Sequence, residues 1–497
     1  MKVQLVGHDE KYVVEQTLLA LFPGEKLSYG PADPAADRRW AVITMEDREG
    51  GGSRCCHVTT ELGWDGNAAP YSFELPLSGT DYEQEGLRRH ALGMCIFRAA
   101  QAVTGIAPPW GSLTGIRPGK IAARSLEGGA SPRETQTLLE DYYRVTPPRA
   151  RLALEAAQAG LRAGGELEGR DIAVYIGIPF CPTRCAYCSF VSASVEKSLS
   201  QVEPYLAALE EEVRAAGALV RRLGLRVRAF YMGGGTPTTL TAEQMDRLLG
   251  VLEDAFELDS CAERTVEAGR PDTVTAEKLR VMKRRGVTRV SVNPQSMDDN
   301  VLRAIGRRHT AEDIRRAMGE VAEAGFAHVN MDLIAGLPAD TPEGFCASLQ
   351  ECMGFGADNL TVHTLSLKKG SAILTRNLPI PTAEAVGRML DYADPALRAA
   401  GYEPYYLYRQ KYMSGSFENV GWCMPGAENL YNIYIMEELC SILSMGAGGS
   451  TKMVAPGRIS RAFNLKYPGE YTRRREKWQS NQAAFAAFYE AMKGAGC

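Results

Sequence analysis

The chain has 497 residues, of which 45% are hydrophobic and 23% are charged, an ordinary composition for a globular protein. One hydrophobic core rarely organises a chain of this length, so we expect two or three domains. The 56 Lys and Arg against 60 Asp and Glu give a net charge of −4. This balance gives no electrostatic argument for nucleic acid or an anionic membrane as a partner.

The first residues, MKVQLVGHDEKYVVEQ, become charged too early for a signal peptide. No run of about 18 apolar residues offers a membrane span. We therefore expect a cytoplasmic protein. Twelve cysteines in that compartment indicate metal or redox chemistry, or buried thiols, rather than a disulfide framework.

Residues 1–165 are predicted to form a separate α/β domain. The predicted strands are VQLVG, RWAVITME, CCHVTTE and YSFELPL. The first predicted helix runs from a cap at Asp9 to about Phe22. Three further helices are predicted over 81–103 and near 132–144 and 147–163. The Gly-rich stretch AGGELEGR is the predicted linker. The loop LTGIRPGK offers Arg117 and Lys120 to a carboxylate or phosphate, but a packed structural loop explains it equally well.

Residues 166–380 alternate between short apolar runs and helical segments. The runs are DIAVYIGIP, RVRAFYMG, RTVEAG, TRVSVNPQ, HVNMDLIAG and NLTVHTLSL. This rhythm predicts parallel βα units, and six of them predict an α/β fold with a partial (β/α)6 barrel whose chemistry lies at the carboxyl ends of the strands. Residues 381–497, with a helix over 383–400 kinked at Pro395 and the aromatic segment GYEPYYLYRQKYM, predict a C-terminal cap.

Three cysteines follow the first barrel strand directly. The segment IPFCPTRCAYCSF places Cys181, Cys185 and Cys188 with three and then two residues between them. Thiolates suit iron–sulfur clusters, whereas a structural zinc site usually needs four ligands and no fourth Cys or His is close in the sequence. Three ligands on a four-iron cubane leave one iron open for a substrate. The alternatives are ordinary thiols or part of a zinc site, and for the remaining cysteines a buried thiol is the simpler interpretation.

The CxxxCxxC loop, Tyr187 before its last cysteine and the barrel rhythm resemble the radical S-adenosylmethionine (SAM) superfamily. The string YIGIPFCPTRCAYCSF is similar to the oxygen-independent coproporphyrinogen III oxidase group, and LTGIRPGK, PYYLYRQK and GAGGSTK resemble its HemZ-type branch. The resemblance implies a [4Fe–4S] cluster on the three cysteines, with SAM as the second cofactor. It also implies an electron from a small electron-transfer protein and a 5′-deoxyadenosyl radical as the reactive species.

The same resemblance implies a set of residues that bind SAM. They are Gly233, Gly234, Gly235, Thr236, Glu267, Gln295, Arg307 and Asp332. Glycines let the backbone approach a ligand, and an ionised Asp332 suits a pair of ribose hydroxyls because it only accepts hydrogen bonds. The alternatives are an ion pair with Arg270 for Glu267, and surface or packing positions for Gln295 and Arg307. Tyr175 in the first barrel strand is the predicted catalytic residue.

The implied substrate is coproporphyrinogen III, a tetrapyrrole, which loses carbon dioxide from two propionate side chains and becomes protoporphyrinogen IX in haem biosynthesis. Its four carboxylates are expected to meet cations, and the candidates are Arg308, Lys368, Lys369, Arg409 and Lys411, although each alone is more often a solvated charge. The tyrosines at 405, 406 and 408 either contact the tetrapyrrole or form core, and core is favoured.

Two positions depart from the pattern of that group. Gly177 stands where a Tyr-x-His motif has its histidine, and Phe190 stands where a fourth cysteine is common. Two alternatives stay open: a haem-binding chaperone of the same fold, and another radical SAM enzyme that acts on tetrapyrroles. The chaperone carries an HNxxYW stretch, whereas residues 428–433 here are ENLYNI, so its His and Trp are absent.

Overall fold

The computed structural model of the chain describes residues 1–22, 24–50, 53–115, 117–188, 193–368, 370–410 and 414–494. The chain divides into two compact units. The first contains residues 1–154 and 409–417, and the second contains 155–408 and 418–497. Residues 155–165 therefore group with the second unit, whereas the three-domain division drawn from the sequence stays a prediction.

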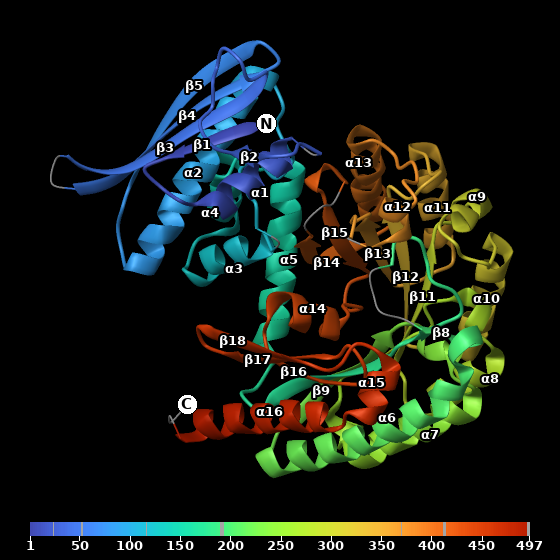
Figure 1. Ribbon diagram of the computed structural model, residues 1–497. Coiled ribbons are helices and arrows are strands. Elements are labelled where there is room, and N and C mark those ends of the chain that lie inside the picture. The colour runs from blue at the N-terminus through green and yellow to red at the C-terminus, as the bar shows by residue number, and fades with distance from the viewer. Residues whose placement is uncertain are drawn as a thin grey trace. The chain divides into compact units, whose positions relative to one another are not determined.

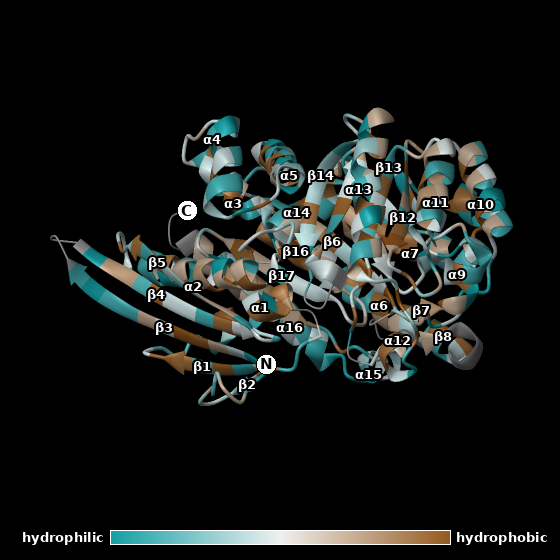
Figure 2. Cartoon of the chain, turned by 90° about the horizontal axis from the view of Figure 1, so that it is seen from above, coloured by the Kyte–Doolittle hydropathy of each residue, from teal (hydrophilic) through white to brown (hydrophobic). Residues whose placement is uncertain are grey.

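The first unit contains a five-stranded sheet in the order β2-β1-β3-β4-β5 (Figure 1). Its strands are β1 (Lys2–Val6), β2 (Ser28–Tyr29), β3 (Arg39–Gly50), β4 (Ser53–Trp64) and β5 (Asn67–Pro76). Figure 2 shows hydrophilic and hydrophobic residues mixed along β3 and β4, as expected for strands with one face on a core. The four strands predicted in this region are confirmed.

Helices of the first region are α1 (Lys11–Leu21), α2 (Asp81–Thr104), α3 (Gly119–Glu127), α4 (Pro132–Thr137) and α5 (Pro147–Gly165). The long helix α2 begins at a capping box in which Thr80 and Glu83 satisfy each other's backbone N–H groups. The predicted cap at Asp9 is wrong, because Glu10 occupies the position before α1 and no side chain caps this helix. Helix α3 was not predicted, since its sequence follows a Gly- and Pro-rich loop.

The second unit is built on one large sheet with six consecutive parallel strands. They are β6 (Asp171–Ile178), β9 (Arg226–Gly234), β10 (Glu263–Glu267), β11 (Arg289–Gln295), β12 (His328–Ala335) and β13 (Asn359–Thr364). Each lies at a run predicted from the sequence, so the expected α/β fold with parallel units is confirmed. The carboxyl ends of all six strands meet at one edge of the sheet.

Helices cover the outer face of this sheet (Figure 1). They are α6 (Val195–Leu223), α7 (Ala242–Ala255), α8 (Ala276–Arg284), α9 (Asp299–Ala304), α10 (Ala311–Ala324), α11 (Pro342–Gly354) and α13 (Ala383–Ala399). Five of them begin at a threonine whose hydroxyl accepts a backbone N–H of the first turn: Thr241, Thr275, Thr310, Thr341 and Thr382. These caps fix where each helix starts after its loop.

The C-terminal part extends the sheet at both edges. Strands β14 (Glu403–Arg409) and β15 (Glu418–Cys423) lie beyond β13, and β16 (Ser441–Met445), β17 (Ser450–Ala455) and β18 (Arg458–Phe463) lie beyond β6. Helices α14 (Leu430–Glu437), α15 (Pro468–Arg473) and α16 (Glu476–Gly494) connect and follow them. This region is more regular than expected, and α13 continues as one helix through Pro395.

Among the helices of the described residues, none combines the length and apolar character needed to cross a membrane.

Candidate functional site

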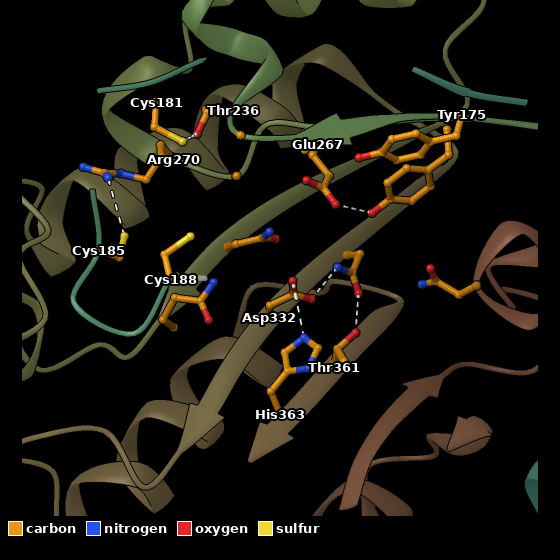
Figure 3. Close-up of a pocket in the computed structure, with 18 of the residues that line it drawn as sticks. Tyr175, Cys181, Cys185, Cys188, Thr236, Glu267, Arg270, Asp332, Thr361 and His363 are labelled. Atoms are coloured by element: carbon orange, nitrogen blue, oxygen red, sulfur yellow. Dashed lines mark hydrogen bonds and ion pairs between the residues drawn. The ribbon is translucent and has the colours of Figure 1, made fainter. Parts of the chain in front are cut away.

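A cavity of about 510 Å³ lies at the carboxyl ends of the parallel strands in the second unit (Figure 3). Predicted site residues that line it are Tyr175, Cys181, Cys185, Cys188, Gly234, Gly235, Thr236, Glu267, Gln295, Arg307 and Asp332. Gly233 is the one predicted residue outside the lining. The fold therefore brings together residues that are spread over more than 150 positions of the chain.

The cysteine loop is held on two sides by backbone hydrogen bonds. The loop starts at β7 (Phe180–Cys181), which pairs with β8 (Ala193–Ser194). The N–H of Ala186 donates to the carbonyl of Ile305 at 2.8 Å, and the same residue's carbonyl accepts the N–H of Ile373 at 3.2 Å. These bonds fix the loop against the end of α9 and the start of α12 (Ala372–Thr375). Phe190 lies outside the described residues.

Two of the three sulfurs receive hydrogen bonds from cavity residues. The hydroxyl of Thr236 donates to Sγ of Cys181 at 3.5 Å, and Nη1 of Arg270 approaches Sγ of Cys185 at 3.9 Å (Figure 3). Hydrogen bonds of this kind orient ligands that hold a metal or cluster. All three thiols are partly accessible. By contrast, burial raises the pKa of Cys56 and of Cys95 to about 11, which fits inert core thiols.

The thiol set fits a cluster better than a single ion. Within the described ranges, no three His, Cys, Asp or Glu side chains come close enough to hold one metal ion. A zinc ion would gather its thiolates about 2.3 Å from a single point. A cubane distributes its thiolates over separate irons, so its cysteines stand further apart. Three thiols on one loop, with no fourth Cys, His, Asp or Glu ligand among the described residues, fit a cubane better than a zinc ion.

The glycine loop after β9 packs against the cysteine loop. Gly235 donates its N–H to the carbonyl of Ile178 and Thr236 donates to that of Phe180, both at 2.7 Å. A Cβ atom on Gly235 would lie 2.5 Å from the Phe180 carbonyl oxygen, so only glycine fits. A Cβ on Gly233 would lie 3.0 Å from the carboxyl carbon of Glu267. Gly233 therefore makes room for Glu267 instead of lining the cavity.

Glu267 pairs with a tyrosine and not with an arginine. Oε1 of Glu267 accepts a 2.5 Å hydrogen bond from the hydroxyl of Tyr231. Burial raises the pKa of Glu267 to about 7, although the tyrosine bond opposes this shift. Arg270 pairs with Asp272 at 3.1 Å. The alternative of an ion pair between Glu267 and Arg270 is therefore wrong.

Gln295 and Arg307 are both buried, which excludes the surface alternative for them. Gln295 has a left-handed φ of 69°, and its buried Oε1 lacks a hydrogen-bond partner among the described residues. Arg307 donates to the carbonyl of Asn293 and, at 3.1 Å, to the hydroxyl of Tyr187. Backbone strain and an unsatisfied amide oxygen in one cavity residue are typical of a ligand-binding position.

Asp332 is held by residues that the sequence interpretation missed. Its Oδ1 accepts from Asn330 at 2.9 Å, and Nε2 of His363 lies 3.7 Å from Oδ2 (Figure 3). Burial alone would raise the pKa of Asp332, but its hydrogen bonds with His363, Asn330 and Thr361 outweigh burial and lower it. Period-two alternation could have revealed these residues, because 330 and 332 share one face of β12, and 361 and 363 share one face of β13.

Three tyrosines form a stack in the cavity wall. Tyr231 and Tyr431 have ring centroids 4.6 Å apart at 24°, and Tyr175 lies 6.2 Å and 6.0 Å from them with similar tilts. They come from β9, α14 and β6. Tyr406 and Tyr408 also line the cavity, whereas Tyr405 does not and donates to Oδ1 of Asn359 in the core. Tyr405 is therefore a core residue, which is the interpretation that the sequence favoured.

The cations proposed for substrate carboxylates do not line this cavity where they are described. Arg308 is exposed and Lys368 is partly buried outside the lining. Arg409 groups with the first unit and donates to the carbonyls of Leu113 and Ser416 there. Lys369 and Lys411 lie outside the described residues. The guanidinium groups that do line the cavity are those of Arg270 and Arg307.

Comparison with known proteins gives consistent matches. The radical SAM superfamily model matches residues 175–352. The oxygen-independent coproporphyrinogen-III oxidase-like protein HemZ of Bacillus subtilis (strain 168) is 35% identical over 98% of this chain and 97% of its own length. The heme chaperone HemW of Mycobacterium tuberculosis is 30% identical over 61% of this chain and 74% of its own.

Among solved structures, coproporphyrinogen III oxidase (HemN) from Escherichia coli, a radical SAM enzyme by its description, matches with a TM-score of 0.52 and 25% identity. It covers 64% of this chain and 72% of its own. The parallel strands with a three-thiol loop at their carboxyl ends define a class of proteins that handles SAM on an iron–sulfur cluster. The chain belongs to the radical SAM superfamily and, within it, to the group of oxygen-independent coproporphyrinogen III oxidase-like proteins. Its cofactors are accordingly a [4Fe–4S] cluster and SAM.

Proposed function

We propose that this chain is an enzyme that converts coproporphyrinogen III to protoporphyrinogen IX by oxidative decarboxylation without oxygen. The observation that carries the proposal is the convergence of the three-thiol loop and the SAM-binding candidates in one cavity. Support comes from the HemZ protein, which aligns along nearly the whole chain, and from HemN, which shares the fold.

In this proposal Cys181, Cys185 and Cys188 hold the cluster through their thiolates. The hydrogen bonds from Thr236 and Arg270 to two of the sulfurs stabilise the negative charge. When both cofactors are bound, they supply the chemistry that removes a hydrogen atom from an unactivated carbon. The protein's own task is to hold the reactants in place and exclude water.

The polar residues of the cavity suit the separate parts of SAM. Glu267, with a pKa near neutrality, accepts a hydrogen bond from an ammonium group. Asp332 stays ionised because its pKa is lowered, so it accepts from two hydroxyls of a ribose. The unsatisfied Oε1 of Gln295 offers a further acceptor. Arg307, buried and cationic, is placed to meet a carboxylate.

Tyr175 is proposed to contact the reacting molecules. A Cβ atom on Gly234 would lie 3.3 Å from the hydroxyl of Tyr175, so this hydroxyl stands beside the glycine loop. The stacked rings of Tyr231 and Tyr431 continue the wall from there. Such a wall presents flat apolar surface to a ring system and keeps water from the reacting carbon.

The test is an anaerobic assay of reconstituted protein with SAM, a reductant and coproporphyrinogen III. Protoporphyrinogen IX, carbon dioxide and 5′-deoxyadenosine should appear together, and the Cys185→Ala variant should form none of them. Formation of 5′-deoxyadenosine without decarboxylation would contradict the substrate and favour another radical SAM reaction on a tetrapyrrole.

The haem-chaperone alternative is tested in parallel by haem titration. HemW proteins match this chain over part of its length. Glu428, at the position of their histidine, lies outside the cavity lining; its backbone carbonyl accepts from Arg289 at 3.1 Å. This placement does not favour a haem ligand there. Stoichiometric haem binding without turnover would nevertheless overturn the enzyme proposal.

A further inference from the structure

A second cavity borders the cysteine loop. It has a volume of about 350 Å³ and is formed by the cysteine loop, the end of α9 and the segment around α12. Cys185 is the residue that lines both this cavity and the large one. The loop of the proposed cluster is therefore reached from two directions, one of which does not pass through the SAM-binding candidates.

The walls of this second cavity are fixed to the cysteine loop. Backbone bonds join Ala186 to Ile305 and to Ile373, and the hydroxyl of Thr183 donates to the carbonyl of Gly306 at 3.1 Å. A surface attached in this way keeps a constant separation from Cys185, which an electron-transfer contact requires.

The second cavity is lined by three positively charged side chains. Arg184, Arg303 and Arg376 line it, all three side chains are exposed, and its described lining contains no Asp or Glu. Arginine is enriched at protein interfaces relative to the rest of the surface. We call Arg184, Arg303 and Arg376 the arginine surface.

We propose that the arginine surface is the docking site of an acidic one-electron donor protein, and that the electron enters through Cys185. This inference rests on the proposed function, because it needs a cluster on the cysteine loop. One electron leaves the donor, which is oxidised, and reduces the cluster. No bond forms or breaks and no atom is transferred.

A protein partner explains the surface better than a small anion. Redox encounters between proteins bury little area and are weak, and complementary charge steers them. Three exposed arginines around a small cavity offer that steering at the point where Cys185 is reached. A small anion would be held by buried, converging donors, whereas these side chains extend into solvent.

The test uses the full chain with Arg303→Glu and Arg376→Glu combined, and Arg184 is kept because it belongs to the cysteine loop. A control with Arg280→Glu and Arg388→Glu makes the same change of charge at exposed positions on α8 and α13. Binding of a reduced flavodoxin is titrated at low and high salt. We expect the affinity of the first variant to fall about tenfold at low salt and that of the control to stay unchanged.

SAM cleavage separates docking from chemistry. Driven by dithionite, both variants should match the wild-type rate; driven by reduced flavodoxin, only the Arg303/Arg376 variant should slow. Equal flavodoxin binding by all three proteins overturns the docking proposal. A second result would also overturn the docking proposal. Inorganic phosphate would bind the wild type but not the Arg303/Arg376 variant, while both bind flavodoxin equally well. The arginine surface would then be a site for a small anion. A wild type without dithionite-driven cleavage refutes the proposed function instead, and the binding titration still decides about docking.

Discussion

The hydroxyl of Tyr231 donates a 2.5 Å hydrogen bond to Oε1 of Glu267, between the neighbouring parallel strands β9 and β10. Burial raises the pKa of this carboxyl group to about 7. Burial thus favours the protonated form of this carboxyl group in the ligand-free cavity. A ligand that brings positive charge favours its ionised form, so this pair couples ligand binding to pH.

The pKa of Glu267 predicts how the stability of the ligand-free protein depends on pH. Its pKa is raised from 4.5 to about 7 on folding. As pH rises through this range the unfolded state loses its proton first, so stability falls, by up to about 3 kcal/mol for this group. Glu267→Gln should remove that part of the pH dependence in anaerobic denaturant titrations. The exposed Glu277→Gln should keep it, and equal pH profiles for wild type and Glu267→Gln would contradict the shift.

Gly235→Ala should damage the contact between the glycine and cysteine loops. The new Cβ would lie 2.5 Å from the Phe180 carbonyl oxygen, which accepts the N–H of Thr236. We expect a loss of stability of about 1–3 kcal/mol and reduced iron content after reconstitution. Gly319→Ala is the matched control, because nothing lies within 4 Å of its Cβ, and alanine there should stabilise α10 slightly. Normal iron content in Gly235→Ala would refute the argument.

Gln295→Gly should stabilise the ligand-free protein and weaken its binding of SAM. Glycine adopts a φ of 69° without the strain that Gln295 carries, so the ligand-free protein should gain up to about 1 kcal/mol. SAM affinity, measured by equilibrium dialysis, should fall because the amide is lost. Ala339→Gly relieves a similar φ of 66° at an exposed position outside the cavity, so it should stabilise without changing SAM affinity. Unchanged SAM binding by Gln295→Gly would remove this residue from the site.

Gly177→His, which restores the Tyr-x-His motif of the group, should destabilise this protein. A Cβ at 177 would lie 3.1 Å from the carbonyl oxygen of Ala447, which follows strand β16, the neighbour of β6 in the sheet. The carbonyl of Gly177 also accepts the buried hydroxyl of Tyr205 at 2.6 Å. We expect a loss of about 1–3 kcal/mol in thermal or denaturant unfolding. Gly165→His, with open space around its Cβ, should stay within about 0.5 kcal/mol of wild type. A variant as stable as wild type would show that β16 moves aside.

The sequence predicted the barrel strands and the cysteine loop because their signals are local. Six apolar runs of strand length, separated by helical segments, require nothing beyond the neighbouring residues to be recognised. The spacing of Cys181, Cys185 and Cys188 likewise predicts that three thiols lie on one loop, and the structure places all three at the cavity. The cap at Asp9 and the missed helix α3 failed because a cap or a helix start next to Gly and Pro depends on backbone geometry that the sequence leaves open.

Local sequence patterns did not predict which residues of the site form hydrogen bonds or ring contacts with one another. Periodicity shows that Asp332 faces one side of its strand, but the register between β12 and β13 decides that His363 and Thr361 stand beside it. The same holds for Tyr431, which α14 brings to Tyr231 from 200 positions further along the chain. Sequence alone therefore determined the strands, the thiol loop and the cofactor chemistry. Tertiary structure decided the partners of each charged group, because hydrogen-bond register and long-range packing bring together residues with no local relation.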